Sequence, residues 1–73
     1  MDAIKLIYDP TGRTLTIWFD DPSKESVCEE TADEVVLMKD VGGRVIGLEI
    51  LGYQARGKGR SLTVETEVLG EVG

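Results

Sequence analysis

The chain of 73 residues contains no histidine and only one cysteine, Cys28. A lone cysteine cannot form a disulfide within the chain, and structural zinc requires a full set of Cys or His ligands. The missing histidine also removes the commonest general base of enzymes. Glu29 and Glu30 follow Cys28, and their negative charge is expected to raise the pKa of the thiol, which disfavours the nucleophilic thiolate. We therefore expect no catalytic residue, no metal and no cofactor, and we interpret the protein as a non-enzyme.

Basic residues are also scarce, because eight Lys and Arg stand against 14 Asp and Glu, which gives a net charge of −6. Binding to the phosphate backbone of nucleic acids depends on many Lys and Arg side chains, so nucleic acid is not an expected partner. No apolar run approaches the ~20 residues that span a bilayer, and the first residues lack the features of a signal peptide. A single unpaired cysteine fits a reducing compartment. These features predict a cytoplasmic protein with no membrane partner.

Helical periodicity is absent, and short runs of β-branched and aromatic residues recur between turn signals. The pattern predicts an all-β fold, a small antiparallel β-meander sheet of five to six strands, in a single domain that spans residues 1–73. The expected strands lie at residues 3–8, 14–19, 26–31, 34–40, 44–51 and 61–69. Residues 29–34 allow a second interpretation as one short helical turn or a bend, since Ala and Glu favour helix while Thr31 and Asp33 suit a cap or turn.

Glycines mark the turns and one unusual strand position. Gly42 and Gly43 tolerate the positive φ angles of a tight hairpin turn, which makes that hairpin the strongest local signal. Gly12 supplies a positive φ angle if the first turn needs one. Gly47 lies in the middle of a strand, where glycine often marks a bulge or the close approach of another group. We expect a packing role for Gly47.

The C-terminal part of the chain differs in composition from the rest. Residues 52–60, GYQARGKGR, form a flexible, basic and glycine-rich loop, and residues 61–69 are expected to form an extra strand at an edge. Leu62, Val64 and Val68 alternate onto one side of that strand. The loop is long enough to act as a hinge, so the extra strand pairs within its own chain or is exchanged with a neighbouring copy.

A chain of this length has little material with which to cover both faces of a sheet. We expect the core on the face that holds Ile4, Leu6, Leu15, Ile17 and Phe19. The opposite face is expected to form an interface that contains Ile7, Trp18, Val45 and Leu51. Exposed apolar patches commonly mark interfaces, and Trp contributes strongly to binding there. The sequence thus predicts sheets packed face to face in a homodimer or higher homo-oligomer.

Several segments together resemble a small prokaryotic family known as domain of unknown function 2283. They are LTIWF at 15–19, the acidic loop that follows it, EVVLMKD at 34–40 and GRVIGLEIL at 43–51. The last segment is the most specific, and the resemblance runs from about residue 4 to residue 51. It implies a compact antiparallel β domain without an established enzymatic activity. Some members are similar to small partners of toxin-like proteins, which implies a regulatory or antitoxin-like role. The chain departs from the family pattern after Leu51.

Two functional hypotheses follow. The leading one is a non-catalytic, self-associating β domain that acts as a protein-interaction module and binds a protein partner. The alternative is the binding of a small molecule or anion at an oligomer interface, where the glycines of RGKGR let backbone amides approach the ligand. The residues expected at that second site are Gly47, Tyr53, Arg56, Lys58 and Arg60.

Overall fold

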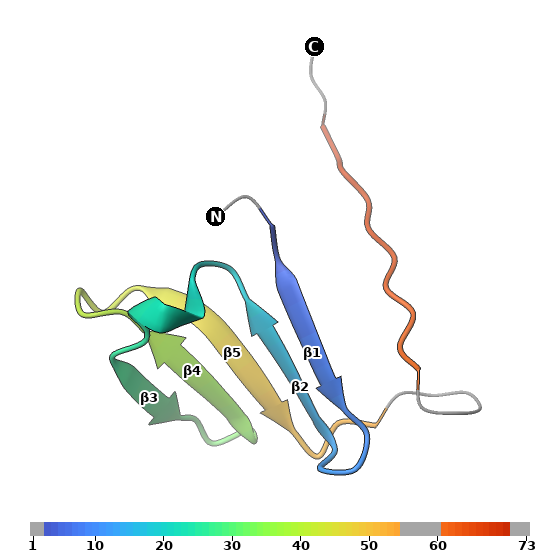
Figure 1. Cartoon of the computed structure of the whole chain (residues 1–73), viewed down its shortest axis with the longest axis horizontal. Coiled ribbons are helices and arrows are strands. Elements are labelled where there is room, and N and C mark those ends of the chain that lie inside the picture. The colour runs from blue at the N-terminus through green and yellow to red at the C-terminus, as the bar shows by residue number, and fades with distance from the viewer. Residues whose placement is uncertain (1–2, 55–60, 71–73) are drawn as a thin grey trace.

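The computed structural model describes residues 3–54 and 61–70 of the chain. It is an all-β fold with five antiparallel strands in one open sheet, in the order β1-β2-β5-β4-β3 (Figure 1). The predicted fold class is confirmed. No helix among the described residues is long and apolar enough to cross a membrane. The strands are β1 (Lys5–Asp9), β2 (Thr14–Trp18), β3 (Val27–Glu30), β4 (Val35–Lys39) and β5 (Val45–Leu51).

The connection from β2 to β3 determines the strand order. β3, β4 and β5 form a meander, while β1 and β2 form a hairpin that pairs with the other side of β5. The connecting segment passes in front of β5 at one end of the sheet and contains a 3-10 turn, η1 (Pro22–Lys24) (Figure 1). Asp21 begins this turn by accepting a hydrogen bond from Ser23 N at 3.0 Å, and Pro22 suits the first helical position. Residues 29–30 belong to β3 and residues 32–34 form a turn, so of the two interpretations of residues 29–34 the helical turn is wrong and the bend is confirmed.

An aspartate closes the turn between β1 and β2. Asp9 Oδ1 accepts hydrogen bonds from Thr11 N and Gly12 N, each at 3.0 Å. The positive φ angle of this turn, 57°, belongs to Arg13, so the suggestion that Gly12 supplies it is wrong. Gly12 has a steric role instead, since a Cβ there would lie 2.8 Å from Asp9 Oδ2. A side chain at position 12 would displace the carboxylate that holds the turn.

An aspartate also holds the turn between β4 and β5. Asp40 Oδ1 accepts hydrogen bonds from Gly42 N and Arg44 N, each at 2.9 Å. Gly43 has a φ angle of 86°, a value that favours glycine. The predicted hairpin is confirmed, with the positive φ angle at Gly43.

A β-bulge interrupts the pairing of β4 with β5. Met38 lies opposite Gly47 and Lys39 lies opposite Val45, which leaves Ile46 as the extra residue. An extra residue shifts the side chains beyond it to the other face of the sheet. Val45 therefore lies on the same face as Lys39. The prediction that placed Val45 with the three other expected interface residues is wrong for this reason.

The buried core is small for a chain of this length. Ile46, Met38 and Trp18 are 1%, 5% and 8% exposed and pack together, with Val36 against them. The chain exposes 5760 Å², whereas a compact protein of 8.0 kDa exposes about 4,450 Å². Its Cα radius of gyration is 14.1 Å, against about 11 Å for a compact domain of the same length. The single chain thus leaves more surface in water than a compact monomer does.

Residues 61–70 form no strand in this single chain. They run as an extended segment that stands off the sheet on the side of β1 (Figure 1). Leu62 is half-buried, and Val64 and Val68 are exposed. The alternation of apolar residues was interpreted as a strand, but a strand also requires a paired backbone. Residues 61–69 are therefore not a sixth strand of their own sheet.

Candidate functional site

One face of the sheet is apolar across four neighbouring strands. Residues directly opposite each other in paired strands place their side chains on the same face. The register gives two such cross-strand rows, and we call their eight residues the apolar face. The rows are Leu6, Ile17, Leu48 and Leu37, and Tyr8, Leu15, Ile50 and Val35.

The apolar face remains partly in contact with water. Leu6 is 37% exposed, Leu15 is buried by its neighbours, and the six other residues are half-buried. In the part of the chain that the structure describes, no helix or second sheet lies over this face. Toward the β3 side this face carries charge, because Glu29 lies opposite Leu37 and forms an ion pair with Lys39. The face therefore has an apolar centre and a polar margin.

The opposite face, which we call the Trp18 face, is chemically mixed. One of its cross-strand rows contains Trp18, Gly47 and Met38, and the next contains Thr16 and Glu49 in its middle. The ring of Trp18 fills the space that a side chain on Gly47 would occupy. The predicted packing role of Gly47 is thereby confirmed. A polar row across the centre distinguishes this face from the apolar face.

An open pocket of about 300 Å³ lies on the Trp18 face. Its polar groups are the hydroxyl of Thr16, the thiol of Cys28 and the carboxylates of Glu25 and Glu49. The Cys28 thiol donates a hydrogen bond to Glu25 Oε2. This bond raises the pKa of Cys28, with smaller contributions from burial and from the charges of Glu25 and Glu49. The raised pKa favours the protonated thiol over the nucleophilic thiolate. Its lining residues are Ile7, Thr16, Trp18, Glu25, Cys28, Val36, Met38 and Glu49.

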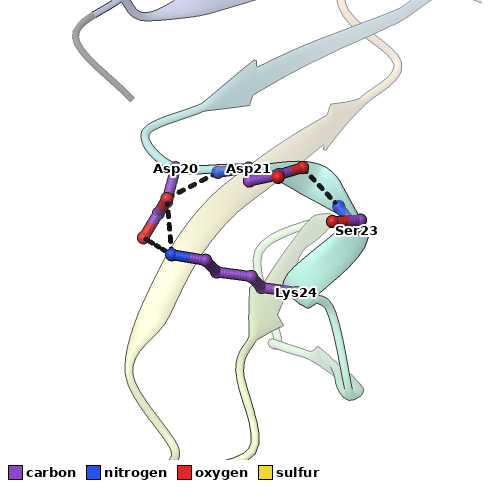
Figure 2. Close-up of polar contacts among 4 residues, drawn as sticks. All are labelled: Asp20, Asp21, Ser23 and Lys24. Carbon is purple, nitrogen blue, oxygen red and sulfur yellow. Dashed lines mark hydrogen bonds and ion pairs between the residues drawn. The ribbon is translucent and has the colours of Figure 1, made fainter.

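The paired carboxylates before β3 serve the loop that contains them. Figure 2 shows Asp20 accepting a hydrogen bond from Asp21 N at 2.7 Å and forming an ion pair with Lys24 at 3.3 Å. The bond from Asp21 N, followed by the bond from Lys24, lowers the pKa of Asp20, and the bond from Ser23 N lowers the pKa of Asp21. These carboxylates are occupied with local contacts. Within residues 3–54 and 61–70, no three potential ligands among Cys, Asp and Glu converge to hold a metal ion.

The four residues predicted as an interface do not form one surface. Ile7, Trp18 and Leu51 share the Trp18 face, whereas Val45 lies on the other side of the sheet. Ile7 and Val45 are 43% and 39% exposed, and Leu51 is half-buried. Trp18 packs in the core of its own chain. The structure thus offers a larger continuous apolar surface on the face that was expected to be the core.

The residues of the predicted anion site are also dispersed. Gly47 lies opposite Trp18 at one end of β2, while Tyr53 N donates a hydrogen bond to Arg13 O at 2.8 Å beyond the other end. The Tyr53 ring contacts Tyr8 edge to face, with centroids 5.8 Å apart. Gly47 and Tyr53 therefore do not share a site. The remaining predicted residues, Arg56, Lys58 and Arg60, lie outside the described residues.

Sequence reasoning assigned one half of the apolar face and missed the other. Leu6, Leu15 and Ile17 were placed on one face correctly, by alternation. That Leu37 and Leu48 continue the same row follows only from the register, which depends on the bulge. The contact between Glu25 and Cys28 was missed because Glu25 precedes the strand and no periodicity predicts its position.

The family comparison covers the whole sheet. A family model described as a protein of unknown function, DUF2283, matches residues 5–53, from the start of β1 to Tyr53. No curated protein and no solved structure matches the chain. The matched region contains both rows of the apolar face and ends before the extended segment 61–70.

Proposed function

This chain belongs to the DUF2283 family, which is described as being of unknown function, and we propose that it is a non-catalytic protein-interaction module. It associates with a second copy of itself through the apolar face. The observation that carries this proposal is the pair of uninterrupted apolar rows across β1, β2, β5 and β4. A continuous apolar surface that is partly in contact with water commonly marks an interaction site.

The size of a typical interface is compatible with pairing. The chain exposes about 1,300 Å² more than a compact monomer of its mass, and the extended segment 61–70 contributes to this excess together with the sheet. A typical stable interface buries roughly 800 Å² on each partner. Two sheets that pack face to face interdigitate their inner side chains at a separation of about 10 Å. Such a pair would bury the apolar face of both copies and supply the second layer that a single sheet lacks.

The distribution of charge also supports pairing of identical faces. In a two-fold symmetric interface the same patch meets itself, so a face with charge of one sign at its centre would repel its copy. The two rows of the apolar face contain no charged side chain. Lys39 and Glu29 pair with each other at the margin, where charges remain hydrated.

Two further parts of the proposal rest on the sequence. The single unpaired cysteine supports a cytoplasmic location. The family resemblance supports a regulatory or antitoxin-like role in which the protein binds one further protein. Repeated co-purification of one specific protein in stoichiometric amount is the expected result for that role.

The test compares two neighbouring substitutions on β1, Leu6→Lys and Ile7→Lys. Both side chains are exposed in the single chain, at 37% and 43%, but they lie on opposite faces. Leu6→Lys should weaken pairing by about 3 kcal/mol, or roughly 100-fold, because it buries an unpaired charge in the interface. Ile7→Lys should leave pairing unchanged. Light scattering across a wide dilution range measures the mass of each variant.

The wild-type chain should show a stable multiple of 8.0 kDa. A wild-type monomer at every concentration would contradict the proposal. Dissociation by Ile7→Lys and not by Leu6→Lys would place the interface on the Trp18 face instead. Circular dichroism of both variants verifies that the sheet is retained.

A further inference from the structure

The extended segment 61–69 has the pattern of a strand without a partner. Leu62, Val64 and Val68 alternate with Thr63, Glu65 and Glu67, which is typical of a half-buried strand. Val64 is 52% exposed and Val68 is 94% exposed in the single chain. Leu62 is half-buried, so most but not all of the apolar side of the segment lies in water, and its extended backbone pairs with no strand of the sheet.

Among the strands of the described residues, β1 and β3 are the two edges of the sheet, and each pairs with one neighbouring strand. Open edges present backbone amides and carbonyls to which another strand can add. β3 is short and ends with Glu29 and Glu30, so an incoming segment that carries Glu65 and Glu67 would face like charges there. β1 offers the longer and more apolar edge, with the sequence KLIYD. Charge therefore favours addition at β1.

The path of the chain also leads toward β1. Tyr53 N is bonded to Arg13 O, and the Tyr53 ring contacts Tyr8 near the end of β1. Six residues separate Gln54 from Ser61, and an extended chain of that length spans at most about 20 Å. Two stacked sheets lie about 10 Å apart. The segment can therefore cross from its own sheet to a sheet stacked upon it.

We propose that residues 61–69 of each copy pair with the β1 edge of the other copy and extend its sheet by one strand. This inference rests on the proposed face-to-face pair. Addition of an extended segment to an exposed edge is a common mode of recognition in which backbone hydrogen bonds supply the affinity. Here the apolar side of the segment would widen the apolar layer between the sheets.

The structure of the single chain points to exchange between copies. The segment stands off its own β1 although the chain leaves the sheet beside that strand (Figure 1). Its extended course also contributes to the radius of gyration of 14.1 Å. An exchanged segment would bring the same residues into a compact assembly.

Isotope-filtered NOE spectroscopy tests the exchange directly. Full-length labelled chain is mixed with unlabelled chain, unfolded and refolded together, so that mixed pairs form. Contacts between residues 61–69 of one chain and Lys5–Asp9 of the other are the expected result. Contacts found only within one chain would overturn the exchange. A pair without any contact between these two segments would overturn it while leaving the proposed face-to-face association intact. A monomer at every concentration would overturn both proposals.

A full-length substitution then tests the role of backbone pairing. Val64→Pro removes a backbone donor and fixes φ within the segment, and it should weaken pairing of the two copies by roughly tenfold or more. It should also speed hydrogen exchange at the outward-facing amides of β1. The matched control is Glu65→Gln, which removes a charge and retains the backbone amide. Equal affinity and equal β1 protection in the wild type and Val64→Pro would contradict the inference. The fold of the single chain should survive, because residue 64 pairs with no strand of its own sheet.

Discussion

The ring of Trp18 lies directly over Gly47, its cross-strand partner. A Cβ on Gly47 would come within 2.6 Å of Trp18 Cε3 and within 2.9 Å of the backbone oxygen of Ile17. Neither atom can retreat easily, since the ring is packed against Met38 and Ile46 and the oxygen belongs to the sheet backbone. The missing side chain at position 47 thus allows the only tryptophan of the chain to lie flat on the sheet and close the core.

Gly47→Ala should therefore destabilise the fold. The added methyl group forces the indole or the β2 backbone to move, and overpacking of this kind costs about 1–3 kcal/mol. Urea denaturation monitored by Trp18 fluorescence measures the loss. The control is Gly42→Ala, where the nearest atom is Asp40 Oδ1 at an ordinary 3.5 Å. That change should alter stability by less than about 0.5 kcal/mol. Equal stability of the two variants would show that Gly47 is not required for packing.

The loop contacts of Asp20 and Asp21 predict a loss of stability in acid. Hydrogen bonds in the folded chain hold the pKa of both carboxylates below the ordinary value of 3.8. A group with a lowered folded pKa stabilises the protein above its unfolded pKa, and this contribution disappears as the pH falls through the folded pKa. The free energy of unfolding should therefore decrease below about pH 4.

Asp20→Asn and Asp21→Asn should each flatten this decline, because an amide does not titrate. The measurement is urea denaturation at several pH values between about 2 and 6. Glu67→Gln is the control, since residue 67 lies in the extended segment outside the sheet. An unchanged pH dependence in both Asp variants would contradict the assigned contacts.

The pocket predicts the reactivity of Cys28. Its pKa is raised chiefly because the thiol donates a hydrogen bond to the Glu25 carboxylate. Glu25→Ala should lower this pKa and increase the rate of alkylation at neutral pH, since the thiolate is the reacting form. The rate measured against pH gives the pKa directly. Glu29→Ala is the control, because Glu29 is adjacent in sequence but points to the opposite face. A larger effect from Glu29→Ala than from Glu25→Ala would contradict the described geometry.

The strands and the two hairpins could be predicted from the sequence because their signals are local. Alternation identified β1 and β2, and Gly43 identified the turn before β5. The faces could be predicted only up to the bulge, since one extra residue at Ile46 reverses the side on which Val45 lies. Trp18 was assigned to an interface because the chain has few residues to cover the face on which it lies, and a large aromatic residue on such a face suggests contact with another chain. Its actual partner is Gly47 in the same chain, and recognising this requires the strand register.

The behaviour of residues 61–69 was beyond prediction for a different reason. The alternation of apolar and polar residues indicates which side of a segment is apolar, but it does not indicate which strand pairs with the backbone of that segment. Likewise, Leu15 is buried as predicted, but placing Leu6 and Ile17 in a core assumed a second layer that the described chain does not form over them. These are properties of tertiary and quaternary arrangement, which one sequence does not encode in local spacing.

The polar row on the Trp18 face limits how far such sheets can assemble. Sheets can stack into fibrils when both of their faces bind other sheets, because each added layer then exposes a new binding face. Here Thr16 and Glu49 occupy the centre of one side, and the connection through η1 lies upon it. When two apolar faces meet, the outer surfaces of the pair are therefore charged and irregular. In the proposed pair, growth by stacking would end after two layers, so one face of the sheet could bind a second copy without promoting aggregation.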